Sequence, residues 1–316
     1  MLANLNDVLK PARENKKAVG LFNTCSLELA RGVMEAAEEL QVPVIIGTAE
    51  ILLPVASLEI MADLLLPMAD RASVPVVVHL DHGLKEETCR RALELGFSSI
   101  MYDCSTDPYE VNVQKIAEMT KLAHSYHATI EAELGHVADN EGAGAVNDPT
   151  MYYTQPDQAK DFVEKTGVDA LAIAVGTAHG AYKLPPKLDF DRIREIAAAI
   201  DPFLVLHGGS GLTDEDFHRA IQEGISKVNI FTDINVAAVK AELKHFSGME
   251  KGLIDLIPAA VEAVKQESMK KMKLFSSDGK AHLCHGKSLN MDVLSASEKE
   301  RLVSLVTEEI MKRLKK

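Results

Sequence analysis

Short apolar runs alternate with longer amphipathic segments along most of the chain. Each apolar run is rich in valine, isoleucine and leucine, which is typical of a buried strand. A turn and then a segment with the periodicity of an amphipathic helix follow each run. Two clear helical segments are residues 26–40 (SLELARGVMEAAEEL) and 85–96 (KEETCRRALELG). Eight such units in roughly 230 residues predict an α/β fold, a (β/α)8 barrel of parallel strands. The expected strands are residues 17–23, 43–48, 75–82, 98–104, 128–135, 169–179, 203–211 and 226–233.

A doubly wound open sheet is the alternative to the barrel. The chain has 316 residues, of which 47% are hydrophobic, and no Gly/Ser/Pro-rich linker divides it, so one large domain is expected. We expect the barrel over residues 1–280 and, because SEKERLVSLVTEEIMKRLKK is helically periodic, a C-terminal helical extension over residues 281–316. The helix after the seventh strand is expected to begin at Thr213, a suitable N-cap followed by acids.

Charge and cysteine content exclude several classes of protein. The net charge is −13, and the 34 lysines and arginines form no basic run, which argues against nucleic-acid or anionic-membrane partners. Four cysteines without a CxxC pair predict neither a disulfide framework nor a cysteine zinc site. The N-terminus lacks an apolar signal core, and the most apolar run, LEIMADLLLPMAD, contains acids. We therefore expect a cytoplasmic protein without a membrane span.

Three histidines stand at strand ends directly before glycine: His82, His179 and His207. The carboxyl ends of barrel strands meet at one mouth, where barrels carry their chemistry. A single histidine there would fit a structural hydrogen-bonding role, but three imidazoles around an open position are a catalytic zinc arrangement. We expect Glu133 to be a fourth or exchangeable zinc ligand. Glu131 lies two residues earlier on the same strand face, and we expect it to orient a zinc-binding side chain by hydrogen bonding without contacting the metal.

A phosphate site is predicted beside these histidines. HGGSG (207–211) and NIFT (229–232) end the seventh and eighth strands, where barrels commonly bind phosphate on backbone N–H groups. Lys183 lies at a reachable distance along the loop GTAHGAYK. The long glycine-rich stretch 135–156 after the fifth strand has the length of an active-site lid.

Zinc next to a phosphate site suits aldol chemistry. Zinc can bind the carbonyl and hydroxyl oxygens of a phosphorylated ketose and, as a Lewis acid, stabilise the enediolate left when the neighbouring C–C bond breaks. The reaction also needs a general acid/base, and Asp81 is the best-placed carboxylate because it adjoins a predicted ligand at a strand end. The alternative role for Asp81 is to orient a histidine.

The motifs LFN, PVIIGT, HLDHG, the D-x-S of MYDCS, EAELG, VGTAHGAYK, LHGGSG and SKVNIFT, in this order over residues 1–280, resemble the class II, zinc-dependent ketose-bisphosphate aldolases. These are the fructose- and tagatose-bisphosphate aldolases, which release dihydroxyacetone phosphate and an aldehyde such as glyceraldehyde 3-phosphate. The resemblance implies Asp81 as catalytic acid/base, with His82, His179 and His207 as zinc ligands and Glu133 contacting the metal in some states. It also implies a homodimer or homotetramer and often a monovalent cation (K⁺ or Na⁺) near the phosphate loops. The implied substrate contacts are Asn23, Gly180, Lys183, Gly208, Gly209, Ser210, Asn229, Ile230, Phe231 and Thr232.

The sequence departs from the family pattern in three places. After EAELG the chain reads HVADNEGAGA, so that Glu141 is the one acid well placed to replace the usual acidic motif. The helix expected to carry an arginine for the sugar's far phosphate reads VEAVK, with Val261 at the arginine position. Residues 281–316 extend beyond the usual end. A substrate without a distal phosphate therefore stays open beside an ordinary bisphosphate.

Other mechanisms and classes fit the sequence less well. A Schiff-base aldolase needs a desolvated lysine at a strand end, whereas Lys227 stands early in the eighth strand. A zinc amidohydrolase would carry a His-x-His pair on the first strand, which reads AVGLFN. A non-catalytic, aldolase-like partner subunit would have no need of the three histidines and Asp81.

Overall fold

The computed structural model describes residues 1–135, 153–177, 187–209, 211–246 and 252–276. The expected substrate or metal residues His179, Gly180, Lys183 and Ser210, the acid Glu141 and the C-terminal extension lie outside the described residues. All described residues belong to one compact unit, Met1–Leu283.

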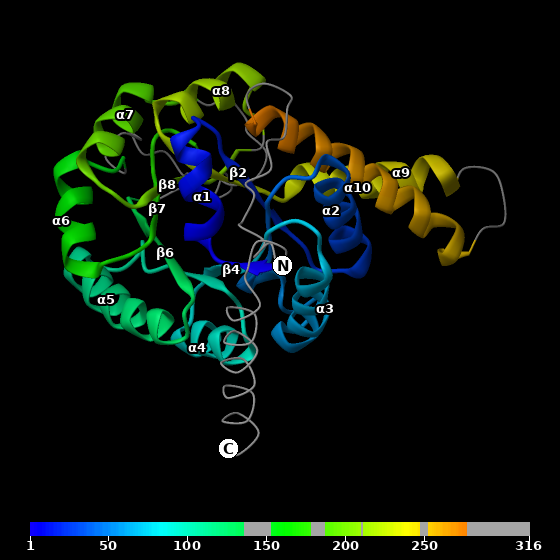
Figure 1. The fold of residues 1–316 in the computed structure, drawn as a ribbon, viewed down its shortest axis with the longest axis horizontal. Coiled ribbons are helices and arrows are strands. Elements are labelled where there is room, and N and C mark those ends of the chain that lie inside the picture. Colours follow the sequence, from blue (N-terminus) through cyan, green and yellow to red (C-terminus); the bar gives the residue numbers. More distant parts are fainter. Residues whose placement is uncertain (136–152, 178–186, 210, 247–251, 277–316) are drawn as a thin grey trace, which may run out of the picture. The chain divides into compact units, whose positions relative to one another are not determined.

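Eight parallel strands form a closed barrel (Figure 1). Neighbours pair in the order β4-β3-β2-β9-β8-β7-β6-β5, and pairing of β4 with β5 closes the ring, which excludes the open doubly wound sheet. Each expected apolar run overlaps one of these strands, but β3, β4 and β9 each extend one residue beyond the predicted range, and β7 and β8 end before the predicted ends at residues 179 and 211. Their bounds are β2 (Val19–Asn23), β3 (Val44–Ala49), β4 (Val76–Gly83), β5 (Ser99–Tyr102), β6 (Thr129–Leu134), β7 (Ala170–Ile173), β8 (Phe203–Leu206) and β9 (Ile225–Ile230).

Helices surround the barrel, and their apolar faces cover it (Figure 1). The two segments predicted most clearly form α2 (Leu27–Leu40) and α4 (Glu86–Leu95). Thr213 caps α8 (Asp214–Glu223) as predicted, through a reciprocal capping box with Asp216. The other helices between strands are α3 (Leu58–Arg71), α5 (Tyr109–Ser125), α6 (Pro156–Thr166) and α7 (Phe190–Ala199), with the short 3₁₀ turn η1 (Glu50–Leu52) after β3.

The N-terminal segment closes the end of the barrel opposite the mouth, which the strand–helix repeat did not predict. The two-residue strand β1 (Leu2–Ala3) pairs with the start of β4, and α1 (Leu5–Glu14) follows it. Leu5, Val8 and Leu9 of α1 are buried against inward side chains of the barrel strands. The apolar spacing of α1 is helical, but only the folded barrel provides the surface that this face covers.

Two long helices, α9 (Thr232–Phe246) and α10 (Leu253–Phe275), lie side by side and extend from the barrel (Figure 1). The start of α9 corrects one predicted boundary, because residues 232 and 233 begin this helix rather than end a strand. Helix α10 also packs on α2 at Gly32, where an added Cβ would lie 2.6 Å from the Cβ of Val264. Glycine thus allows the close approach that joins α10 to the barrel.

Candidate active site

Strand β4 passes from buried valines into a buried polar cluster at the mouth of the barrel. The Asp81 carboxylate, 2% exposed, accepts hydrogen bonds from Asn23 Nδ2 at 2.7 Å and from Asn229 Nδ2 at 3.0 Å. Burial alone would raise the pKa of Asp81, but nearby His82, Lys227 and His207 hold it well below its ordinary value. Asp81 is therefore an ionised carboxylate with a fixed orientation.

His82 reaches the same cluster through a distortion of β4. Consecutive side chains of a regular strand point to opposite faces, which would separate His82 from Asp81. Here the pairing of β4 with β5 shifts register between Leu80 and Gly83, and His82 adopts a left-handed φ of 41°. Such a conformation costs on the order of 1–3 kcal/mol for a residue other than glycine. The surrounding structure holds this strain, and donor atoms of Asp81, His82 and His207 all lie within 4.8 Å of one another.

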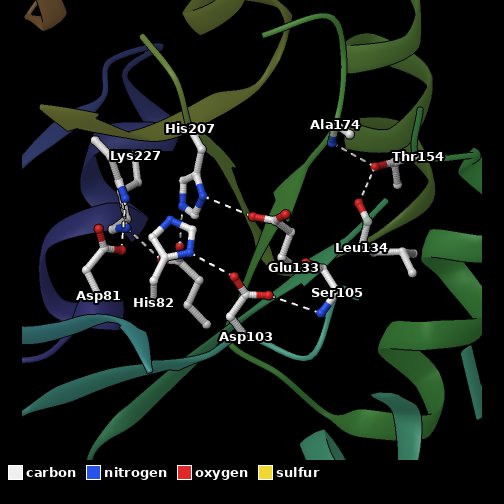
Figure 2. Close-up of polar contacts among 12 residues, drawn as sticks. Asp81, His82, Asp103, Ser105, Glu133, Leu134, Thr154, Ala174, His207 and Lys227 are labelled. Atoms are coloured by element: carbon white, nitrogen blue, oxygen red, sulfur yellow. Dashed lines mark hydrogen bonds and ion pairs between the residues drawn. The ribbon is translucent and has the colours of Figure 1, made fainter. Parts of the chain in front are cut away.

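A carboxylate behind His82 orients its ring. His82 Nδ1 lies 2.8 Å from Asp103 Oδ2, and Asp103 Oδ1 accepts the backbone N–H of Ser105 at 3.0 Å (Figure 2). Burial lowers the pKa of His82, but Asp81 and the hydrogen bond to Asp103 outweigh it and raise that pKa above its ordinary value. Asp103 belongs to the D-x-S motif, so its position after β5 was the signal that could have identified it as a site residue.

His207 follows β8 directly and is fully buried between two carboxylates. Its Nδ1 lies 3.1 Å from Glu133 Oε2 (Figure 2), and its Nε2 lies 2.9 Å from Glu131 Oε1. Burial lowers the pKa of His207, but these two carboxylates raise it to about 10. The His82 and His207 rings are neighbours, with centroids 4.6 Å apart. The structure thus brings together four residues predicted for the site: Asp81, His82, Glu133 and His207.

Two further buried residues belong to the cluster but were not predicted as site residues. His79 is fully buried; its Nδ1 lies 2.8 Å from Ser99 Oγ, and its Nε2 lies 3.9 Å from Asp81 Oδ1. Burial, helped by the charge of Lys227, lowers the pKa of His79 to about 3. Lys227 is also fully buried, with Nζ 2.8 Å from Glu131 Oε2. Alternation along β4 and β9 places His79 and Lys227 among the inward side chains of the barrel, and this spacing could have identified both as site residues.

The predicted substrate contacts within the described residues divide into two groups. Asn23 and Asn229 contact the Asp81 carboxylate. The others stand at the ends of β8 and β9, where two mouth loops begin, and Gly208 has the left-handed φ of 66° that glycine tolerates. These others are Gly208, Gly209, Ile230, Phe231 and Thr232.

The predicted lid, residues 135–156, lies mostly outside the described residues. Its last part returns to the barrel at Thr154. The Thr154 hydroxyl donates to the Leu134 carbonyl and accepts the Ala174 N–H at 2.9 Å, which ties the chain between the ends of β6 and β7 (Figure 2).

The donor set of this cluster fits a bound cation. Donor atoms of Asp81, His82 and His207 lie within 4.8 Å of one another, and so do donor atoms of His82, Asp103 and Glu133. Imidazole nitrogen and carboxylate oxygen are donors that zinc accepts. The third predicted histidine ligand, His179, lies outside the described residues.

Comparison with known proteins shows the family of the chain. The family model described as "Fructose-bisphosphate aldolase class-II" matches residues 3–280. The chain belongs to the class II fructose-bisphosphate aldolase family. It is accordingly an aldolase, which is a lyase.

Relatives are similar over nearly their whole length. "Uncharacterized protein YdjI" of Escherichia coli K12 is 38% identical over 281 residues, covering 89% of this chain and 100% of that protein. Its crystal structure, described as that of the YdjI aldolase, superposes with a TM-score of 0.81 at 36% identity over 89% of this chain and 100% of that one. "Fructose-bisphosphate aldolase" of Thermus caldophilus is 36% identical over 306 residues, covering 89% of this chain and 100% of that protein.

A more distant solved structure supports the same fold. The putative fructose-1,6-bisphosphate aldolase from Coccidioides immitis matches with a TM-score of 0.77 at 29% identity, covering 86% of this chain and 96% of that one.

Among the described residues, no helix is both long and apolar enough to cross a membrane.

Proposed function

We propose that this enzyme cleaves and forms, in the cytoplasm and with zinc, the aldol bond of a ketose 1-phosphate or ketose 1,6-bisphosphate of the fructose or tagatose type. The products of cleavage are dihydroxyacetone phosphate and an aldehyde such as glyceraldehyde 3-phosphate. One observation carries the proposal: an ionised Asp81, held by two amide donors, has His82 and His207 donor atoms within 4.8 Å. Acid/base and metal-binding groups are thus held at one point.

His82 and His207 would hold the zinc, with Glu133 as a carboxylate ligand and His179 as the third histidine. When bound, zinc supplies a Lewis acid that stabilises negative charge on the ketose oxygens during C–C cleavage. The chain's own carboxylates prepare the two histidines for this role. Asp103 orients His82 through Nδ1 and Glu131 orients His207 through Nε2, which leaves the opposite ring nitrogens directed toward the site.

Asp81 is proposed to move the proton on the aldehyde side of the bond. In cleavage, its carboxylate takes the proton of the substrate hydroxyl at the carbon that becomes the aldehyde, and in condensation it returns that proton. Because Asn23 and Asn229 donate to its two oxygens, the carboxylate is held in one orientation and stays ionised until substrate presents the hydroxyl. A fixed orientation of this kind is what proton transfer over hydrogen-bond distance requires.

The substrate's 1-phosphate is proposed to bind at the loops after β8 and β9. Gly208 and Gly209 supply one loop, and the start of α9 at Thr232 supplies a helix N-terminus, whose free N–H groups favour anions. A side chain on Gly209 would crowd Phe217, whose ring atoms lie 3.1 and 3.2 Å from an added Cβ. A monovalent cation, K⁺ or Na⁺, is proposed beside these loops on family resemblance.

The far end of the substrate is proposed to lack an ordinary phosphate. Val261 stands where the family places its phosphate-binding arginine, and its side chain is 4% exposed within α10. Lys265, the nearest replacement on that helix, pairs with Glu39 of α2 at 2.6 Å. A buried phosphate dianion needs a cationic partner, and neither of these two positions offers one that is not already paired.

A substrate comparison tests this proposal. The expected result is that fructose 1,6-bisphosphate and tagatose 1,6-bisphosphate exceed fructose 1-phosphate in kcat/KM by less than about a hundredfold, because no arginine holds a second phosphate. Released dihydroxyacetone phosphate is measured with a coupled enzyme on the zinc-loaded protein. A bisphosphate advantage of about a hundredfold or more, about 2.7 kcal/mol of transition-state binding, would instead establish a distal phosphate clamp. Absence of triose phosphate from all three would contradict aldol cleavage of these ketose phosphates.

We also infer that the enzyme is a homodimer or homotetramer that associates through α9. Val236, Val239, Leu243 and Phe246 are spaced along one stripe of this helix and are 41%, 48%, 67% and 54% exposed. The start of α10 adds further exposed apolar side chains, Leu253 and Ile254, at 69% and 81% exposure. An apolar stripe of this length, with helical spacing, is typical of a surface that another protein covers.

Leu243→Asp is expected to dissociate the oligomer, because a carboxylate at the centre of the stripe would lose its hydration at the interface. Light scattering coupled to size-exclusion chromatography at micromolar concentration measures the mass. Ile60→Asp on α3, a position of similar exposure at 60%, is the matched control and should leave the mass unchanged. A monomeric wild-type protein, or a Leu243→Asp variant that keeps the wild-type mass, would contradict association through α9.

A further inference from the structure

Lys227 is a fully buried lysine to which the proposed chemistry assigns no step. It lies within β9, and its Nζ is 2.8 Å from Glu131 Oε2 and 2.7 Å from Asn229 Oδ1. Lysine is almost never fully buried unless it is paired, because its ammonium loses hydration. Both contacts of Lys227 lead directly to groups of the active site.

The contact between Lys227 and Asn229 determines which end of the Asn229 amide faces Asp81. An ammonium has hydrogen-bond donors only, so Asn229 must present its oxygen to Lys227. The amide nitrogen then points the other way and donates to Asp81 Oδ1 at 3.0 Å. In the reversed orientation, the NH₂ group would face the ammonium and the amide oxygen would face the carboxylate, so both contacts would be repulsive. Lys227 thereby keeps one of the two donors on Asp81.

The contact between Lys227 and Glu131 determines which Glu131 oxygen faces His207. Lys227 holds one carboxylate oxygen of Glu131, and the other lies 2.9 Å from His207 Nε2. An ammonium at ion-pair distance favours the charged form of the Glu131 carboxylate. A charged acceptor at Nε2 keeps a proton on that nitrogen and directs Nδ1 toward Glu133.

We propose that Lys227 is a positioning residue that orients Asp81 through Asn229 and His207 through Glu131, so that one ammonium aligns the acid/base with the metal-binding histidine. The path runs from Glu131 on β6 through Lys227 and Asn229 on β9 to Asp81 on β4. This inference rests on the proposed aldol chemistry of Asp81 and His207.

A purely structural role makes a different prediction, and a double variant separates the two. If Lys227 only balances the buried charge of Glu131, then Lys227→Met/Glu131→Gln removes both charges and should be at least as active as Glu131→Gln alone, in which Lys227 keeps its charge. If Lys227 positions Asn229, the same variant keeps its fold, and the amide introduced by Glu131→Gln can still accept from His207, but Asn229 is no longer held.

We expect Lys227→Met/Glu131→Gln to match Glu131→Gln alone in zinc content and melting temperature, while its kcat falls a further ~10- to 100-fold, the usual effect of losing a hydrogen bond to a charged group. KM should change less than about threefold, because Lys227 is not proposed to contact substrate. A crystal structure should show Asn229 Nδ2 beyond about 3.5 Å from Asp81, outside hydrogen-bond range. A kcat within about threefold of that of Glu131→Gln alone would overturn the proposal.

Two further variants keep the test decisive. Should the first variant not fold, Lys227→Gln/Glu131→Gln replaces it, since glutamine fills the site with a polar group but can present either end to Asn229. A kcat equal to that of Glu131→Gln alone in that variant would likewise contradict positioning. Asn229→Ala alone should reproduce the loss in kcat, and adding Lys227→Met/Glu131→Gln to it should cause little further loss, because the changes interrupt one path. Failure of the proposed function shows separately, as absence of aldol cleavage by the wild-type enzyme.

Discussion

Asp81→Ala is expected to keep zinc bound and to lose C–C cleavage by about 10²- to 10⁴-fold, the usual contribution of a general acid/base. The physical reason is local. Asp81 is 2% exposed, and Asn23 and Asn229 fix both of its oxygens, so no other carboxylate takes its position when it is removed. Alanine is the informative replacement, because asparagine would turn an amide NH₂ toward one of these two donors.

Release of triose phosphate and zinc content, measured on the same preparation, check this prediction. Asp63→Ala, which removes an exposed carboxylate from α3, is the control and should match the wild type in both. Exchange of the C-3 proton of dihydroxyacetone phosphate separates the two halves of the reaction, since it does not require the aldehyde-side proton transfer. If the Asp81→Ala variant cleaves the ketose at more than about a tenth of the wild-type rate, Asp81 has a structural role and is not the general acid/base.

His207→Ala is expected to lose bound zinc and turnover together. His207 is fully buried between Glu131 and Glu133, so its removal takes away a ligand and leaves two carboxylates facing a cavity. Elemental analysis of the purified variant and a triose phosphate assay measure the two losses. His124→Ala is the matched control, because that histidine pairs with Asp169 at 2.9 Å and is 46% exposed. His124→Ala should keep both zinc and activity.

Chelation and borohydride treatment complete this test on the wild type. A strong chelator should abolish activity, and added zinc should restore it. Borohydride with substrate should trap no lysine, since the buried Lys227 ammonium is already engaged by Glu131 and Asn229. A covalent adduct on any lysine, or full activity of His207→Ala without zinc, would contradict the metal mechanism.

Sequence patterns were sufficient for the barrel because the signals are local. Each apolar run overlaps a strand, and the amphipathic segments between runs form helices whose caps, such as Thr213, can be identified in the sequence. Strand ends were predicted less well: the eighth run was extended to residue 233, although α9 begins at Thr232. Apolar residues at the barrel mouth continue the strand pattern, whereas the chain turns there once no neighbouring strand offers hydrogen bonds.

The candidate site was partly predictable for a geometric reason. Parallel strands in a closed barrel bring all their carboxyl ends to one mouth, so His82, His207 and Glu133 were expected to meet before any distance was known. Asn23 and Asn229 were associated with the same mouth by family resemblance. The sequence did not show that both amides donate to Asp81, since the three residues stand on different strands.

The order of strands and helices, and the end of the barrel that carries the chemistry, follow from the amino-acid pattern, because periods of two and 3.6 residues act between near neighbours. The pairing of the polar groups, in contrast, depends on the closed barrel. The partners of Asp81 and His207 lie 58, 148 and 76 residues away in the chain, so the barrel must close before they meet. The left-handed His82 also required the fold, since strand alternation would have turned that ring away from Asp81. The burial of Lys227 depends likewise on a carboxylate that only the closed barrel places opposite it.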